Sequence, residues 1–177
     1  MSTIIFIDFW EICDIMGVNQ LTVDSGQLTV ILNKEGTIMK RIMGIDYGDA
    51  RTGIAFSDLL CSIVGSTTVI HSRKPEKTLQ EIVKLAKENE AGEIVMGLPK
   101  NMDGSEGPRA ELCRAFAQQV REATGLEVTL WDERRTTVEA HNILSDHNYH
   151  GKKRKNTVDA VAASLILEGY LNFRKRS

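Results

Sequence analysis

The stretch from Ile42 to Asp58 constrains the fold of this chain more than any other. Its sequence is IMGIDYGDARTGIAFSD, in which two short apolar runs flank a segment with two glycines. That pattern predicts a β-hairpin. Asp46 stands at the end of the first predicted strand, where a buried carboxylate is costly unless it is paired, hydrogen-bonded or bound to a cation. The simpler explanation for Asp46 is that it caps the turn.

Beyond the hairpin, strand-like and helix-like patterns alternate. One continuous apolar run is too short for a helix, so it predicts a central strand buried on both faces. In one helical segment, Leu112, Phe116 and Val120 mark an apolar face. The order of the elements predicts a mixed α/β sheet of five strands with helices on its faces. The further strands are predicted at 66–70, 94–99 and 127–131, and the helices at about 75–89, 109–123, 138–144 and 157–173.

The composition is that of an ordinary globular protein. Of the 177 residues, 42% are hydrophobic and 26% are charged, which is typical of one folded domain. No apolar run approaches the roughly 20 residues that a membrane-spanning helix needs, and the start of the chain lacks a secretory signal. The three cysteines are far apart and form no CxxC pair, which predicts reduced thiols in a cytoplasm and argues against a zinc site.

Residues 1–38 differ from the rest of the chain. They carry one lysine against five acidic residues, a charge of −4, so residues 39–177 carry +2 of the overall −2. We expect 1–38 to be an N-terminal extension and 39–177 to be the folded domain. One hypothesis is that translation begins at Met39, which an N-terminus near Met1 in the native protein would contradict.

Acidic residues also stand at two other places that the predicted fold brings toward the hairpin. Asp132 and Glu133 follow the fifth strand, and ligands of such sheets bind at the carboxyl ends of parallel strands. Asp159 lies in a helix that is apolar nearly all round, among small residues that would let the helix approach the sheet. A helix cap is the simpler role for Asp159, but Asn156 and Thr157 are better placed for it.

Three converging carboxylates without a histidine or cysteine partner suit hard divalent cations such as Mg²⁺ or Mn²⁺. Two such ions about 3.5–4 Å apart stabilise the attacking water and the leaving oxygen in phosphodiester hydrolysis. Strand alternation places Asp132 and Glu133 on opposite faces, without deciding which of them points into the site.

Four segments in order resemble the four motif blocks of the YqgF family, the RuvC-like branch of RNase H-fold nucleases. The segments are GIDYGDARTGIAFSD, EIVMGLPKNMDGSEGPRA, WDERRTTVEA and KKRKNTVDAVAASLILEGYL. The family is described as nucleases of pre-16S rRNA or as Holliday junction resolvases. The resemblance implies an RNase H-like fold with Asp46, Glu133 and Asp159 as catalytic, metal-binding acids, and it favours Glu133 over Asp132. The upstream extension has no counterpart in the family.

Basic residues near these acids predict contacts with nucleic acid. Two arginines directly after Glu133 suit bidentate contacts with phosphate, although one of them could pair with a site carboxylate instead. A basic run before the Asp159 helix could hold a phosphate backbone with salt-sensitive, largely sequence-independent affinity. A solvated loop is the simpler reading of that run. The residues are Arg134, Arg135, Lys152, Lys153, Arg154 and Lys155.

The sequence therefore predicts a cytoplasmic, metal-dependent endonuclease of structured nucleic acid, with no membrane partner. The resemblance favours the 5′ end of pre-16S rRNA as the substrate. A Holliday junction is the alternative, and a resolvase would act as a homodimer to cut two strands symmetrically. A non-cleaving nucleic-acid-binding protein stays open, because intact ligands do not prove turnover. An actin-like ATP-binding domain also uses an Asp-x-Gly hairpin, but this chain lacks a second lobe and a second such loop.

Overall fold

The computed structural model describes residues 18–23, 29–33, 40–132 and 152–176. The chain divides into two compact units, Met1–Lys40 and Arg41–Ser177. In the first unit, β1 (Val18–Val23) and β2 (Thr29–Asn33) pair in an antiparallel two-stranded sheet. Among the described helices, none combines the length and the apolar character that crossing a membrane requires.

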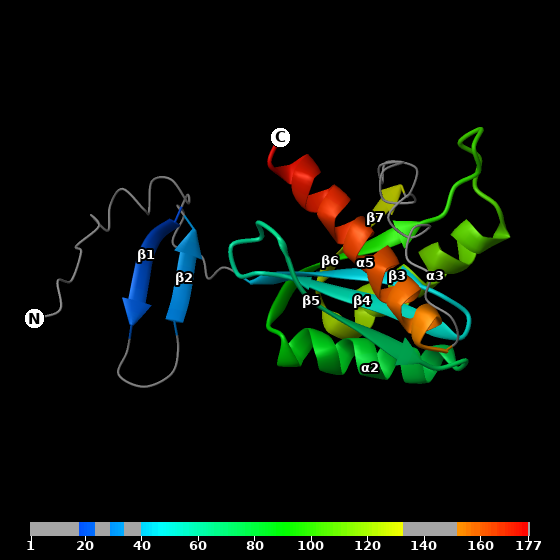
Figure 1. The fold of residues 1–177 in the computed structure, drawn as a ribbon, viewed down its shortest axis with the longest axis horizontal. Helices are drawn as coiled ribbons and strands as arrows, with labels where there is room; N and C mark the ends of the chain where they lie inside the picture. Colours follow the sequence, from blue (N-terminus) through cyan, green and yellow to red (C-terminus); the bar gives the residue numbers. More distant parts are fainter. Residues whose placement is uncertain (1–17, 24–28, 34–39, 133–151, 177) are drawn as a thin grey trace, which may run out of the picture. The chain divides into compact units, whose positions relative to one another are not determined.

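The second unit is built on a five-stranded mixed sheet in the order β5-β4-β3-β6-β7 (Figure 1). Three strands pair antiparallel, and β6 and β7 continue the sheet parallel to β3. The predicted mixed sheet of five strands is therefore confirmed. The strands are β3 (Arg41–Tyr47), β4 (Arg51–Ser57), β5 (Val64–His71), β6 (Ala91–Leu98) and β7 (Glu127–Asp132).

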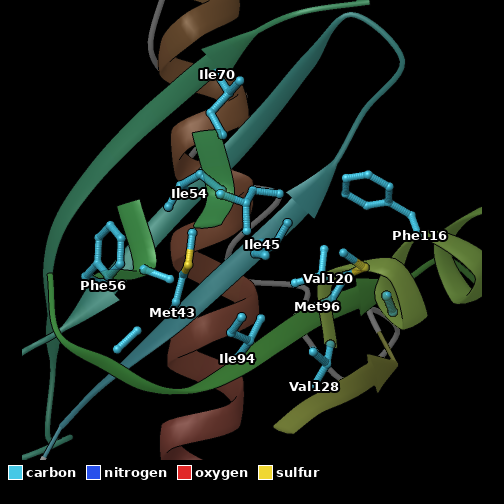
Figure 2. Packing of buried hydrophobic residues seen from close by; sticks show 14 residues of the cluster. Met43, Ile45, Ile54, Phe56, Ile70, Ile94, Met96, Phe116, Val120 and Val128 are labelled. Atoms are coloured by element: carbon cyan, nitrogen blue, oxygen red, sulfur yellow. The ribbon is translucent and has the colours of Figure 1, made fainter. Parts of the chain in front are cut away.

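Helices α2 (Pro75–Glu88) and α3 (Pro108–Thr124) cover one face of this sheet, and α5 (Lys152–Arg174) covers the other. Figure 2 shows the larger core, to which Met43 and Ile45 of β3 and Phe116 of α3 belong. Alternate residues of β3 and β4 therefore belong to two different cores. Leu112 is 57% exposed, so its predicted place on the buried face of α3 was wrong. The helix predicted at 138–144 lies outside the described residues.

The last helix begins five residues earlier than the sequence predicted. α5 starts at Lys152, so Asn156 and Thr157 lie inside the helix and neither is its N-cap. The physical reason is that lysine and arginine are good helix formers, so the basic run extends the helix instead of forming a loop. Asp159 consequently lies about two turns into α5.

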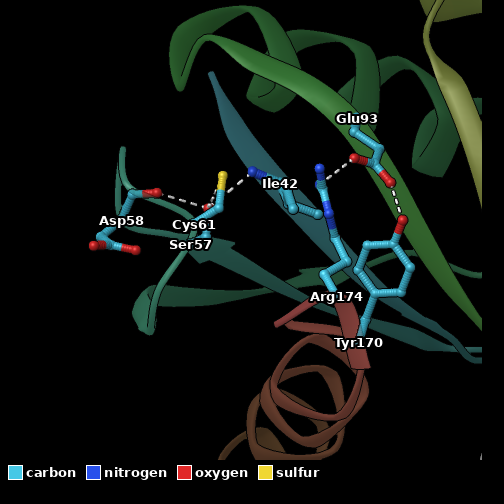
Figure 3. A network of polar contacts seen from close by, with 7 residues as sticks. All are labelled: Ile42, Ser57, Asp58, Cys61, Glu93, Tyr170 and Arg174. Atoms are coloured by element: carbon cyan, nitrogen blue, oxygen red, sulfur yellow. Dashed lines mark hydrogen bonds and ion pairs between the residues drawn. The ribbon is translucent and has the colours of Figure 1, made fainter. Parts of the chain in front are cut away.

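The C-terminal half of α5 is fixed to the sheet by a polar network (Figure 3). The Tyr170 hydroxyl donates to the carboxylate of Glu93 on β6, and the Arg174 guanidinium lies 2.7 Å from the other carboxylate oxygen. Glu93 pairs in register with Ile42, near the start of β3. This network therefore holds α5 at the end of the sheet away from Asp46.

Candidate active site

Asp46 lies near the carboxyl end of β3, on the face that α5 covers. Its neighbours Met43 and Ile45 belong to the core of the opposite face, whereas Gly44 packs against Leu167 of α5. Burial, and secondly the negative charge of Asp159, raise the pKa of Asp46 to about 6, and the positive charge of Arg109 partly opposes them.

The helix carrying Asp159 comes unusually close to the hairpin. Gly53 pairs in register with Asp46, and a Cβ built on Gly53 would lie 2.0 Å from the backbone oxygen of Asp159. A Cβ on Gly44 would likewise lie 2.9 Å from Cβ of Leu167. Two glycines of the sheet thus permit the close approach that sequence reasoning assigned to the small residues of the helix. The negative charge of Asp159 consequently acts on Asp46 and contributes to its raised pKa.

Arg51 at the start of β4 pairs with Asp159. Its Nε atom donates to Oδ2 of Asp159, and the two side chains are 32% and 21% exposed. No hydrogen bond contributes to the pKa of Asp46 among the described residues. The two carboxylates therefore differ in their surroundings. The Arg51 guanidinium pairs directly with Asp159, whereas Asp46 is half-buried and is influenced by the charge of Arg109.

This pair of carboxylates suits a divalent cation. Burial and the charge of Asp159 disfavour a negative charge on Asp46, and a bound cation would relieve both effects. Oxygen donors of this kind are the ligands that Mg²⁺ and Mn²⁺ prefer. Within the described ranges, no group of three or more His, Cys, Asp or Glu residues could hold a metal ion.

The register of β7 bears on the third predicted acid. Trp131 packs on the α5 face, with its ring 5.6 Å from that of Tyr170. Asp132 pairs in register with Leu98, which packs against Ala110 and Cys113 of α3 on the opposite face. Asp132 thus occupies a position on the face away from Asp46.

The remaining predicted site residues are only partly described. Glu133, Arg134 and Arg135 lie outside the described residues. The backbone of the basic run, Lys152–Lys155, forms the first turn of α5, the helix that also carries Asp159.

Arg109 is a site-adjacent residue that sequence reasoning missed. From the first turn of α3 it donates to the carboxylate of Asp49 and to the carbonyl of Tyr47. Its guanidinium also lies 5.5 Å from the centre of the Tyr47 ring, which stacks on Phe116 with ring centres 3.9 Å apart. Arg109 therefore clamps the hairpin turn that follows Asp46. The sequence held one indication of this role, because Arg109 lies in the second of the four segments that resemble the family motifs.

Comparison with known proteins identifies relatives of the second unit. A sequence model of the family described as "RuvX: Holliday junction resolvase" matches residues 40–173. A Halothermothrix orenii protein named "Putative pre-16S rRNA nuclease" is 47% identical over 136 residues, which cover 77% of this chain and 97% of the relative. A protein of the same name from Carboxydothermus hydrogenoformans is 41% identical over 137 residues, covering 77% and 99%.

A solved structure shares the fold at low sequence identity. The T. thermophilus RuvC structure in complex with Holliday junction substrate superimposes with a TM-score of 0.52 at 9% identity, covering 76% of this chain and 96% of that one. At this identity the similarity concerns the fold alone, and it confirms the expected RNase H-like architecture.

Proposed function

This chain belongs to the RuvX family, and on that basis we propose that it is a metal-dependent endonuclease that processes the 5′ end of pre-16S rRNA. The membership confirms the family that the four sequence segments resemble. Nuclease activity follows from the family and its named relatives. The rRNA substrate is the finer proposal, and it rests on relatives that are 41–47% identical over nearly their whole length.

The observation that carries a metal-dependent mechanism is the convergence of Asp46 and Asp159 on one face of the sheet. Asp46 follows an apolar strand into a half-buried position, and α5 brings Asp159 close enough to raise the pKa of Asp46. Carboxylates placed in this way are stabilised by a bound cation more than by water.

We assign Asp46, Glu133 and Asp159 as the acids that hold Mg²⁺ or Mn²⁺. The position of Asp132 on the opposite face supports Glu133 as the third acid. When bound, the ion supplies an activated water and neutralises charge on the leaving oxygen. The task of the chain is to fix the carboxylates: Gly53 sets the depth of α5, and Arg109 holds the turn after Asp46.

Contacts with the nucleic acid are assigned to basic residues flanking these acids. Lys152, Lys153, Arg154 and Lys155 open the helix that carries Asp159, so a phosphate backbone bound by this turn would run toward the acids. Arg134 and Arg135 follow Glu133 directly in sequence. Such contacts favour polyanions without reading their sequence.

A four-way DNA junction is the alternative substrate, favoured by the description of the matching family. That activity would involve a homodimer, because two symmetric cuts need two sites related by a two-fold axis. The rRNA substrate would also place the enzyme in the bacterial cytoplasm.

Cleavage assays separate these substrates. Wild-type protein is incubated with a precursor rRNA 5′ leader or a synthetic four-way junction, in Mg²⁺, in Mn²⁺ and in EDTA. We expect metal-dependent cleavage of the RNA and little cleavage of the junction. Junction cleavage alone would establish the alternative substrate. Binding without cleavage of either substrate, under both metals, would contradict a nuclease and leave a binding role, while thermal stabilisation by ATP would indicate the actin-like class.

A further inference from the structure

Arg51 presents a fixed positive charge to one of the two proposed metal ligands. It is the first residue of β4 and lies two positions before Gly53, on the same face of the strand. Its Nε atom donates to Oδ2 of Asp159 across 108 positions of sequence. A guanidinium stays protonated at any relevant pH, so this charge can leave the carboxylate only by moving away.

The pairing is selective between the two acids. Asp159 receives the Arg51 guanidinium, whereas Asp46 is influenced by Arg109, whose own hydrogen bonds go to Asp49 and Tyr47. Arg109 is therefore committed to the hairpin turn. The Arg51 side chain is 32% exposed beside its bond to Asp159, so it has a route to solvent.

We propose that Arg51 is a positioning residue that pairs with the carboxylate of Asp159 until a divalent metal displaces it. This inference rests on the proposed function, and it adds that metal loading competes with an internal arginine. The guanidinium keeps the helix carboxylate neutralised and oriented in the metal-free protein. Because a cation and a guanidinium repel each other at one carboxylate, binding of the metal competes with the Arg51–Asp159 pair.

The proposal predicts that loss of Arg51 strengthens metal binding, which is the opposite of the usual effect of losing a supporting side chain. Loss of most supporting side chains weakens a metal site, because the ligands become less ordered. Loss of a competing cation strengthens it, since the metal no longer has to break an ion pair. Removing the Arg51 charge should tighten metal binding by about five- to tenfold.

The test is isothermal titration of the full-length, chelator-treated protein with Mn²⁺ at fixed ionic strength. Wild type is compared with Arg51→Gln, Arg51→Lys and Arg121→Gln. Arg121 is exposed in the last turn of α3, so its substitution makes the same charge change away from the acids. Circular dichroism checks folding, and Arg51→Met replaces Arg51→Gln if the latter does not fold.

Tighter Mn²⁺ binding by Arg51→Gln, with Arg51→Lys and Arg121→Gln near the wild-type value, supports the proposal. Unchanged or weaker binding by folded Arg51→Gln, with wild type binding Mn²⁺ normally, overturns the role of Arg51 and leaves the proposed nuclease intact. A folded wild type that binds no Mn²⁺ overturns both together.

Discussion

Gly53 of β4 lies directly against the backbone of Asp159 in α5. A Cβ on Gly53 would be 2.0 Å from the Asp159 carbonyl oxygen, a separation that real Cβ atoms do not adopt. Because Gly53 also pairs in register with Asp46, this contact helps to set how closely the two acids approach. The geometry of the site thus requires a residue without a side chain at position 53.

Gly53→Ala should therefore separate the acids. The atom in the way belongs to the backbone, so α5 itself must shift, and we expect destabilisation of about 1–3 kcal/mol, as for other overpacked sites. Affinity for Mn²⁺ should fall at least about tenfold, because misplaced ligands bind metal poorly. Gly65→Ala in β5 is the control, since the nearest atom to its Cβ would be an ordinary 3.5 Å away. Equal Mn²⁺ affinity in both variants would show that Gly53 does not set the site.

Asp46→Asn should stabilise the metal-free protein at neutral pH. The pKa of Asp46 is raised from 3.8 to about 6, so between these values the folded state retains a proton that the unfolded chain has released. The free energy of unfolding therefore falls as pH rises through this window, by about 3 kcal/mol in total, and the loss is complete above pH 6. The amide avoids the ionisation that causes this loss.

Urea denaturation in EDTA at pH 4 and pH 8 measures that effect. The substitution Asp46→Asn should raise the free energy of unfolding by about 1–3 kcal/mol at pH 8 and change it little at pH 4. An equal change at both pH values would mean that burial of the charge is not the cause.

Arg109→Gln should raise the pKa of Asp46 further. The guanidinium of Arg109 lowers that pKa in the wild type, so its removal takes away a stabilising charge. Carbon-13 NMR of the Asp46 carboxyl group in the metal-free protein measures the titration directly. Arg114→Gln serves as the control, because Arg114 binds Glu106 at 2.6–2.7 Å and its charge does not contribute to the raised pKa of Asp46. A pKa that does not move in Arg109→Gln would contradict the assigned role.

The double substitution Lys152→Gln with Lys153→Gln should flatten the salt dependence of nucleic-acid binding. Removal of one phosphate contact reduces the slope of log K against log salt by about 0.7–0.9. Fluorescence anisotropy with labelled RNA gives the slope. The matched control replaces Lys175 and Arg176, two exposed basic residues that directly follow the opposite end of α5. Equal changes in both pairs would indicate a general charge effect and no defined backbone path.

The sequence was sufficient for the parts of the fold that depend on local pattern. The hairpin around Asp46 and the buried strand 94–99 follow from apolar runs and glycine positions, and both occur in the structure as β3–β4 and β6. The start of α5 was misplaced because a lysine-rich segment is polar enough for a loop and yet has high helix propensity. The surrounding fold decides whether such a segment forms a loop or a helix.

Pairings between distant residues could not be predicted in this way. Arg51 and Asp159 are 108 positions apart, and Arg109 lies 60 positions from Asp49. Strand alternation separated Asp132 from Glu133 but gave no reference for which face held the site. The pairing of Asp132 with Leu98 supplies that reference. Leu98 packs on the α3 face, so Asp132 lies on that face of the sheet as well. Sequence pattern fixes relative positions along a strand, whereas the site depends on which helix covers each face.

The most direct test of the three-acid site is metal-dependent cleavage of the precursor rRNA leader by matched acid variants. Asp46→Asn, Glu133→Gln and Asp159→Asn are compared with Asp132→Asn, each checked for folding by circular dichroism. We expect the first three to lose on the order of 100-fold or more in rate, because each removes a proposed metal ligand, while Asp132→Asn stays within a few-fold of wild type. An active Glu133→Gln beside an inactive Asp132→Asn would contradict the proposed site, and so would cleavage that survives Asp46→Asn.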